Sequence, residues 1–150
     1  ASHQSMMQMK RYLGKVSGPL LDRIDLHIEV NKVSFDELAS KQKGESSESI
    51  RERVLETRDI QKTRFWTFAG VHCNAQMSTK MVRKVCVLDD KSSELLRNAI
   101  NSLGLSARAY DRILKVARTI ADLEKQERIQ TAHIAEAIQY RSLDREGWQI

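Results

Sequence analysis

The sequence predicts a mostly α-helical fold, in which a helical bundle is preceded by one β-strand. Proline occurs once in the 150 residues, at Pro19, so the ring that breaks helices is absent from the rest of the chain. After Val33, apolar residues recur at intervals of three and four, which is the spacing of an amphipathic helix. We therefore divide the chain into an N-terminal segment that contains the strand, residues 1–33, and a helical domain, residues 34–150.

The strand is predicted for residues 24–30. A turn at residues 17–19 precedes it, and apolar Ile, Leu, Ile and Val then alternate with polar Asp, His and Glu. Arg23 stands where the turn meets the strand, so the backbone would hold its guanidinium at the end of a sheet. A cation fixed in this way suits a phosphoryl group that gains charge during transfer. The alternative is a surface ion pair of Arg23 with Asp22 or Asp25, which contributes little energy.

Two capping boxes predict the first helices. Ser34-Phe35-Asp36-Glu37 would start a short helix at Phe35, and Ser49-Ile50-Arg51-Glu52 would start a charged helix that runs to about Arg64. Residues 41–47, between them, contain Gly and several Ser and predict an exposed loop. The second helix has only a thin apolar face, so we expect it to be poorly buried. Residues 65–77 show no clear period, which predicts an irregular but packed connection. We expect its aromatic residues, Trp66 among them, to anchor it in the core.

The second half of the chain predicts a short helix followed by three longer ones. Their expected N-caps are Ser78 or Thr79, Asp89 or Asp90, Ser106 and Thr131. Gly104 is expected to end the second of these helices in the left-handed conformation. Because the connections between the three longer helices are short, they predict a compact antiparallel bundle.

Composition limits the classes of function. The chain is 41% apolar and has no stretch long enough to cross a membrane and no signal peptide, so the cytoplasm is the expected compartment. Its net charge of +5 permits contact with nucleic acid or nucleotides without requiring it. Aromatic residues make up only 5%, which argues against a base-stacking platform. The basic residues between Arg51 and Arg64 alternate with acidic residues, which predicts a solvated helix face.

The sequence contains no obvious catalytic or metal-binding motif. No Gly-Lys-Ser or Gly-Lys-Thr occurs, so a phosphate-binding loop is missing and the chain should not hydrolyse ATP alone. Cys73 and Cys86 are expected to be free thiols, and with His72 they match no zinc spacing. His133 is expected to be a structural histidine on the last helix. We therefore expect neither a metal nor a cofactor to be bound to this chain by itself.

Arg108 is the second arginine with a possible role. It lies in the first turn of the helix that starts after Ser106, where the backbone N–H groups and the helix dipole favour an anion. A phosphate could bind there. The alternative is an arginine that only points into solvent.

Several longer motifs resemble one family. They comprise Arg11-Tyr12 with Ser17–Val30, then Asn74–Ser78, Leu105–Leu123 and His133–Arg141. In this order they resemble the end of the ATPase core and the helical lid of the magnesium-chelatase-like AAA+ proteins of bacteria, the competence-related ComM/YifB group. The resemblance spans about residues 11–145.

The resemblance implies a role for each arginine. Arg23 corresponds to the arginine finger, which reaches the γ-phosphate in a neighbouring subunit, and Arg108 to the sensor 2 arginine, which reaches it from the lid of its own subunit. Arg108 and Arg112 are therefore expected to contact nucleotide. The resemblance further implies ATP and Mg²⁺ bound by an upstream ATPase core, assembly into a ring of six identical subunits, and action on DNA.

Two other interpretations stay open. The chain could belong to a chelatase-type ATPase subunit that acts on a protein partner, or it could be a freestanding helical module that binds DNA or protein. In the leading interpretation the strand has lost its sheet. We therefore expect residues up to Val33 to be disordered or to pair with a second copy of the chain.

Overall fold

The computed structural model describes residues 20, 23–28, 30, 32–33, 35 and 44–141. Its labelled elements are α4 (Ser47–Arg64), the 3₁₀ helix η1 (Asn74–Gln76), α5 (Thr79–Val85), α6 (Asp90–Leu103), α7 (Ala107–Leu123) and α8 (Thr131–Gln139). The fold is mostly helical, as the sequence predicts, and no strand occurs among the described residues.

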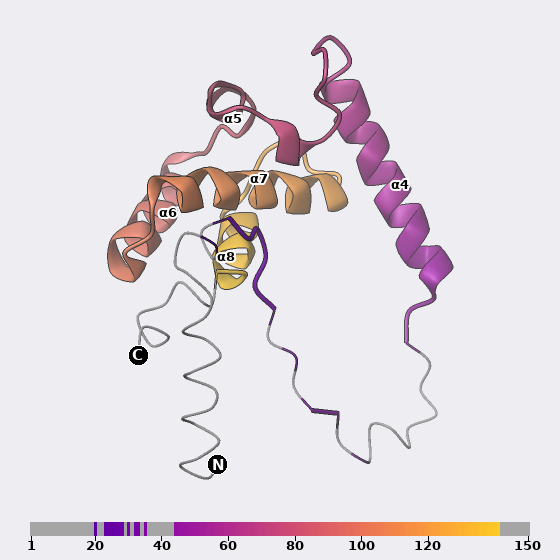
Figure 1. Cartoon of the computed structure of the whole chain (residues 1–150), viewed down its shortest axis with the longest axis horizontal. Coiled ribbons are helices and arrows are strands. Elements are labelled where there is room, and N and C mark those ends of the chain that lie inside the picture. The colour runs from indigo at the N-terminus through magenta and orange to yellow at the C-terminus, as the bar shows by residue number, and fades with distance from the viewer. Residues whose placement is uncertain are drawn as a thin grey trace.

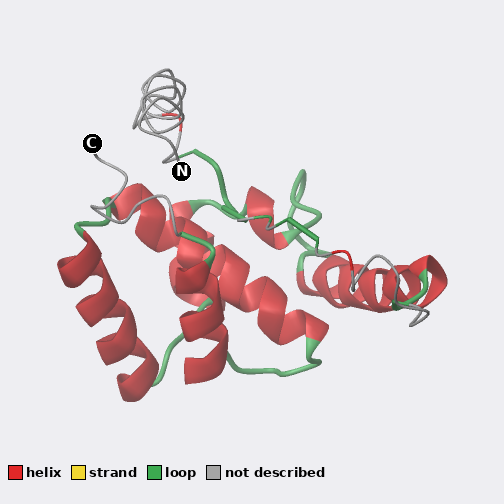
Figure 2. Ribbon diagram, turned by 90° about the horizontal axis from the view of Figure 1, so that it is seen from below, coloured by secondary structure: helices red, strands yellow, loops and turns green. Residues whose placement is uncertain are grey.

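Helix α7 is the centre of the bundle (Figure 1). It packs against α8 on one side and against η1 and α5 on the other, while α6 packs against α8 and α4 contacts α7. Figure 2 shows α4 lying to one side of the other helices. The core is formed by apolar side chains of α5 to α8 and of the connections between them, notably Val82, Leu96, Ile113, Leu114, Ala117, Ala121 and Ile134.

The sequence identifies most helix ends correctly. Ser78, Asp89 and Ser106 each accept a hydrogen bond from the N–H three residues later, at 3.4, 2.8 and 3.2 Å. Such N-caps satisfy amides that have no partner inside the helix. Gly104 follows α6 with φ of 61°, in the predicted left-handed conformation.

Two predicted N-caps are wrong. Helix α4 begins after Ser46, whose side chain accepts from the Ser49 N–H, whereas the Ser49 hydroxyl donates to Glu45 at 2.8 Å. Helix α8 begins after Gln130. Thr131 is already inside α8, and its hydroxyl lies 3.2 Å from that of Ser92 on α6. In both cases the side chain predicted as the N-cap contacts a neighbouring polar group instead. For Ser49 this group is the Glu45 carboxylate, and for Thr131 it is the Ser92 hydroxyl.

The described part of the predicted strand, residues 24–28 and 30, has no regular secondary structure. It contacts helices of its own chain: the His27 N–H donates to the Tyr140 carbonyl at 2.7 Å, and Arg141 donates to the Ile24 carbonyl. These contacts lie within one chain, and the expectation that residues up to Val33 are disordered or pair with a second copy stays a prediction. Its apolar side chains face outward, with Ile28 68% and Val30 87% exposed, whereas His27 is buried.

The remaining early predictions have mixed outcomes. Phe35 is helical, but the rest of its capping box lies outside the described residues. Helix α4 ends at Arg64 as predicted, and its apolar residues Ile50 and Val54 are each 42% exposed. Of the aromatic residues after α4, only Phe65 is an anchor. It is buried and meets Phe68 edge to face, whereas Trp66 is 79% exposed because the turn directs Phe65 inward instead.

The Gly104→Ala substitution should destabilise the protein by about 1 kcal/mol, because an L side chain disfavours the left-handed conformation. A Cβ at this position would meet no atom within 4 Å, so the cost comes from the backbone alone. Urea unfolding measures the difference. Gly44→Ala is the matched control, since Gly44 also has open space around its Cα and no positive φ is found there. Equal stability of the two variants would contradict this account of the α6 C-terminus.

Candidate functional site

Arg108 lies in the first turn of α7, the helix at the centre of the bundle. Ser106 caps this helix through the Ala109 N–H, and Ala109 is fully buried, so the backbone under Arg108 is fixed by the core. The Arg108 side chain is exposed. Within the described residues it forms no ion pair. It is a cation held on a rigid support and available to an external anion.

Arg112 follows Arg108 by four residues and therefore lies on the same face of α7. Its guanidinium forms an ion pair with Asp25, and its side chain is 28% exposed. To contact a nucleotide phosphate as predicted, Arg112 would have to leave Asp25 or share its hydrogen bonds.

Arg23 is exposed in the turn before this segment, and its backbone N–H donates to the Leu20 carbonyl at 2.9 Å. Asp25, one of the two acids considered as its partner, pairs with Arg112. This ion pair brings the segment that carries Arg23 to the face of α7 that carries Arg108 and Arg112. The three predicted site residues thus belong to one region of the molecule.

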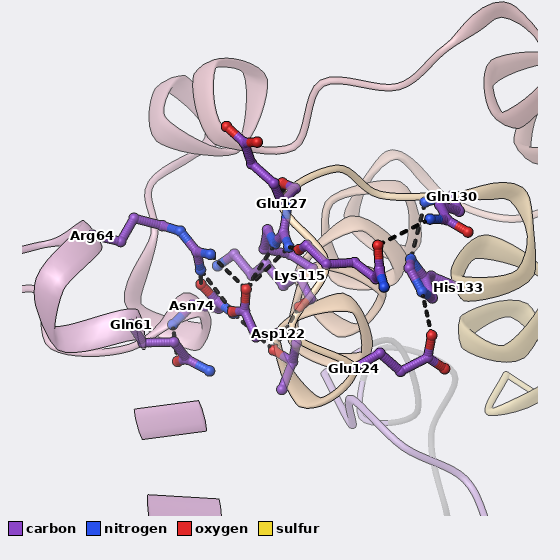
Figure 3. A network of polar contacts seen from close by, with 12 residues as sticks. Gln61, Arg64, Asn74, Lys115, Asp122, Glu124, Glu127, Gln130 and His133 are labelled. Carbon is purple, nitrogen blue, oxygen red and sulfur yellow. Dashed lines mark hydrogen bonds and ion pairs between the residues drawn. The ribbon is translucent and has the colours of Figure 1, made fainter. Parts of the chain in front are cut away.

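A buried polar network, which the sequence analysis missed, lies at the other end of α7 (Figure 3). The fully buried carboxylate of Asp122 accepts from both terminal nitrogens of Arg64, at 2.7 and 2.5 Å. It also accepts from the Asn74 amide at 2.8 Å and from Nε of Arg118 at 3.1 Å. The Gln61 side chain of α4 in turn accepts from the Asn74 N–H at 2.9 Å. Asp122 therefore links α4, η1 and α7.

Arg118 extends this network to the turn after α7. Its two terminal nitrogens donate to the carbonyls of Glu127 and Gln126, at 2.8 and 2.5 Å. In this turn Lys125 has a φ of 56°, and the Gln126 N–H donates back to the Ala121 carbonyl at 2.8 Å. This is the helix ending that glycine usually makes, here with a lysine in the left-handed position. The Arg118 hydrogen bonds help to hold it in that conformation.

Burial shifts the pKa of two groups in and near the network. Burial lowers the pKa of Arg118, and the Asp122 carboxylate opposes this effect. Burial also raises the pKa of the nearby Cys86 thiol to about 11, against the opposing influence of Arg118 and Arg64. Cys86 and the half-buried Cys73 are both unbridged. A pocket of about 510 Å³ adjoins the network, but the guanidinium groups that line it are already bonded to Asp122.

The sequence contains a weak signal for this network. Arg118 and Asp122 are separated by four residues, which usually indicates an exposed helical pair. Their neighbours in the apolar stripe are small, Ala117 and Ala121, so that stripe is wide enough to bury both charges. Arg64, which we assigned to a solvated face, lies at the very end of α4 and turns toward the bundle.

His133 is a structural residue, as predicted. It is buried; its Nδ1 accepts from the Gln130 N–H at 2.9 Å, and its Nε2 lies 3.0 Å from a Glu124 carboxylate oxygen. The ring thus joins the start of α8 to the end of α7. In the part of the chain that the structure describes, no three His, Cys, Asp or Glu side chains form a group that could hold a metal ion. No helix there is long and apolar enough to span a membrane.

Comparison with known families explains this arrangement. The family described as "Magnesium chelatase, subunit ChlI C-terminal" matches residues 44–141, which include all the helices from α4 to α8. The chain belongs to this family. A second family, described as "Magnesium chelatase, subunit ChlI", matches residues 1–38. The domain boundary at Val33 stays a prediction.

Members of the ComM and YifB group are similar to nearly the whole chain. The competence protein ComM of Haemophilus influenzae is 46% identical over 142 residues, which is 94% of this chain and 27% of ComM. The YifB proteins of Salmonella typhimurium and Escherichia coli are 40% and 39% identical, over 92% of this chain and 26% of their own length. The chain thus spans about a quarter of the length of these relatives.

The Asp122→Ala substitution should lower the free energy of unfolding by about 3–5 kcal/mol, because it leaves the buried guanidinium of Arg118 and the partly buried one of Arg64 without their shared acid. Urea unfolding measures the loss. The control is Glu56→Ala, which removes a mostly exposed ion pair with Lys125 and should cost less than about 1 kcal/mol. Similar losses of unfolding free energy in both variants would show that the buried network contributes no more to stability than an exposed ion pair.

Stability should fall in alkaline solution partly through Cys86. The folded protein raises the pKa of this thiol to about 11 from the ordinary value of 9.0, so folding favours the neutral thiol. This contribution is complete below pH 9 and is lost as the pH rises toward 11, by about 2–3 kcal/mol in total. The stability advantage of the parent chain over Cys86→Ala should therefore shrink across this range. A constant difference between pH 8 and 11 would refute the assignment, and Cys73→Ser provides the control.

Proposed function

We propose that this chain is the C-terminal lid portion of an AAA+ ATPase, and that Arg108 contacts the γ-phosphate of ATP from the lid as a sensor 2 arginine. The observation that carries the proposal is the exposed guanidinium of Arg108, which has no acid partner among the described residues and stands on the buried start of α7. A cation that is already in position stabilises charge developing on a phosphoryl group without reorganisation.

Arg23 is the proposed arginine finger, which reaches the nucleotide of a neighbouring subunit in a homo-oligomeric ring. Its exposure in a turn supports this role, since a finger must extend beyond its own domain. Arg112 is the proposed additional nucleotide contact, through a guanidinium that is partly exposed beside Asp25. In this proposal the upstream core holds ATP and Mg²⁺, and the arginines of this chain bind and orient the phosphates.

The outward-facing apolar residues after Arg23 support a missing partner of this kind. Ile28, Val30, Val33 and Phe35 are between 59% and 87% exposed. Several large apolar side chains exposed within a short segment are typical of a surface that another domain covers. We propose that these residues pack into the sheet of the protein's own upstream core.

The match to ComM favours DNA as the substrate of the complete protein, in a helicase or branch-migration motor of the cytoplasm. The family descriptions favour a second candidate, a chelatase-type ATPase subunit that acts on a protein partner. The two differ in one measurement: DNA should stimulate ATP hydrolysis by the first and leave that of the second unchanged.

In the full-length protein, Arg108→Ala and Arg23→Ala should each lower ATP hydrolysis by roughly 10³-fold while ATP binding stays largely intact, because both arginines act on the charge of the transferring group. Steady-state hydrolysis and nucleotide-binding titrations measure the two effects. Arg97→Ala is the matched control, as Arg97 is an exposed arginine of α6 for which the structure gives no contact. Full hydrolysis in either test variant would overturn that residue's assignment.

A further inference from the structure

The positive charge of this chain is concentrated in one stretch. Residues 60–88 contain five Lys or Arg and not a single Asp or Glu, so this stretch alone accounts for the net charge of +5. The rest of the chain has equal numbers of acidic and basic residues. Charge distributed in this way indicates a surface that meets a polyanion.

The structure separates one of these five cations from the other four. Arg64 is neutralised by Asp122 inside the buried network. Lys62, Lys80, Arg83 and Lys84 are exposed, and none of them forms an ion pair with a described residue. Lys80, Arg83 and Lys84 lie at positions i, i+3 and i+4 of α5, so they share one face, while Val82 is fully buried in the core.

The turn after α4 carries an exposed aromatic ring close to Lys62. Trp66 is 79% exposed, and with Asp59, Lys62 and Thr63 it lines a hollow of about 290 Å³. The chain then runs from this turn through η1 to α5, all on the side of α7 that faces away from α8 (Figure 1). We call Lys62, Trp66, Lys80, Arg83 and Lys84 the basic edge.

The nearby acids do not cancel this charge. Asp59 is one residue outside the acid-free stretch and lines the Trp66 hollow. Asp111 of α7 accepts from the Thr79 hydroxyl at 2.7 Å at the start of α5. Asp89 and Asp90 directly follow the acid-free stretch. Among the described residues, none of these acids forms an ion pair with Lys62, Lys80, Arg83 or Lys84, so the four cations stay available to an external polyanion.

We propose that the basic edge binds single-stranded nucleic acid, with phosphates on the α5 cations and a base stacked on Trp66. Phosphates need only exposed cations. The exposed Trp66 ring beside Lys62 also offers an apolar face on which a nucleobase can stack. An acidic polypeptide would use the cations and leave Trp66 without a role. The low aromatic content excludes a platform for several bases, whereas a single exposed Trp suffices for one.

This proposal deepens the proposed function, since it names the surface of the lid that would meet DNA, and it rests on that function only for the choice of DNA over RNA. The test uses the 150-residue chain without nucleotide. Binding of a fluorescein-labelled oligothymidylate is followed by anisotropy at salt concentrations between about 50 and 200 mM. We expect binding that weakens as salt increases.

Two variants test the two parts of the basic edge. The triple variant Lys80→Gln, Arg83→Gln, Lys84→Gln should reduce the slope of log K against log salt by about 2, because each lost phosphate contact removes roughly 0.7 on a single strand. Trp66→Ala should weaken binding about tenfold with little change in that slope. The control is Lys91→Gln, Arg97→Gln, Arg128→Gln, which removes the same charge from exposed positions elsewhere and should bind like the parent chain.

The proposal is overturned if the parent chain does not bind, or if both triple variants lose affinity equally, since net charge alone would then explain binding. It is also overturned if polyglutamate competes as well as oligothymidylate and Trp66→Ala binds normally, because the surface would then fit an acidic protein. Thermal unfolding confirms that each variant is folded. Binding of the oligothymidylate does not depend on Arg23 or Arg108. The roles of these two arginines are tested separately, by ATP hydrolysis in the full-length variants.

Discussion

The carboxylate of Asp122, buried between two guanidinium groups, determines how the helices of this domain are joined. Arg64 ends α4, Asn74 begins η1 and Arg118 lies one turn earlier on α7, and all three donate to the same two oxygens. Because Arg118 also donates to the carbonyls after Lys125, the turn that leads to α8 depends on the same acid. Without it, segments far apart in the sequence would bring like charges together.

This network is better understood as a source of specificity than of stability. Taking three charges out of water costs several kcal/mol for each, and apolar groups of similar shape can be as stable. What apolar groups lack is direction. The long helix α4 has a thin apolar face and few buried residues, so apolar packing alone would leave its orientation on α7 poorly defined. The bidentate bond from Arg64 fixes that orientation.

The sequence predicts the parts of this fold that depend on local chemistry. The caps Ser78, Asp89 and Ser106 and the left-handed Gly104 were predicted correctly because each acts on the backbone within a few residues. The Asp122 network was not predicted, since its partners are up to 58 positions apart in the chain. Trp66 was wrongly expected to be an anchor for the same reason: whether Phe65 or Trp66 turns inward is decided by the packing of distant helices. The roles of Arg23, Arg108 and Arg112 came from resemblance, and the structure adds the exposure of Arg23 and Arg108 and the contact of Arg112 with Asp25.

The uneven distribution of charge along the sequence gives the described part of the molecule one positive edge. Four of the five cations of residues 60–88 lie on the basic edge, the fifth, Arg64, is paired with Asp122, and the rest of the chain has equal numbers of acidic and basic residues. In the field of any polyanion such a molecule experiences a torque, so it rotates while it still diffuses and arrives with α5 and Trp66 in front. Orientation before contact increases the fraction of collisions that are productive, and the advantage weakens as salt shortens the range of the field, to about 8 Å at physiological ionic strength. In the proposed ring of identical subunits, the same edge would recur at every position, so that successive subunits would present it to a common axis or rim.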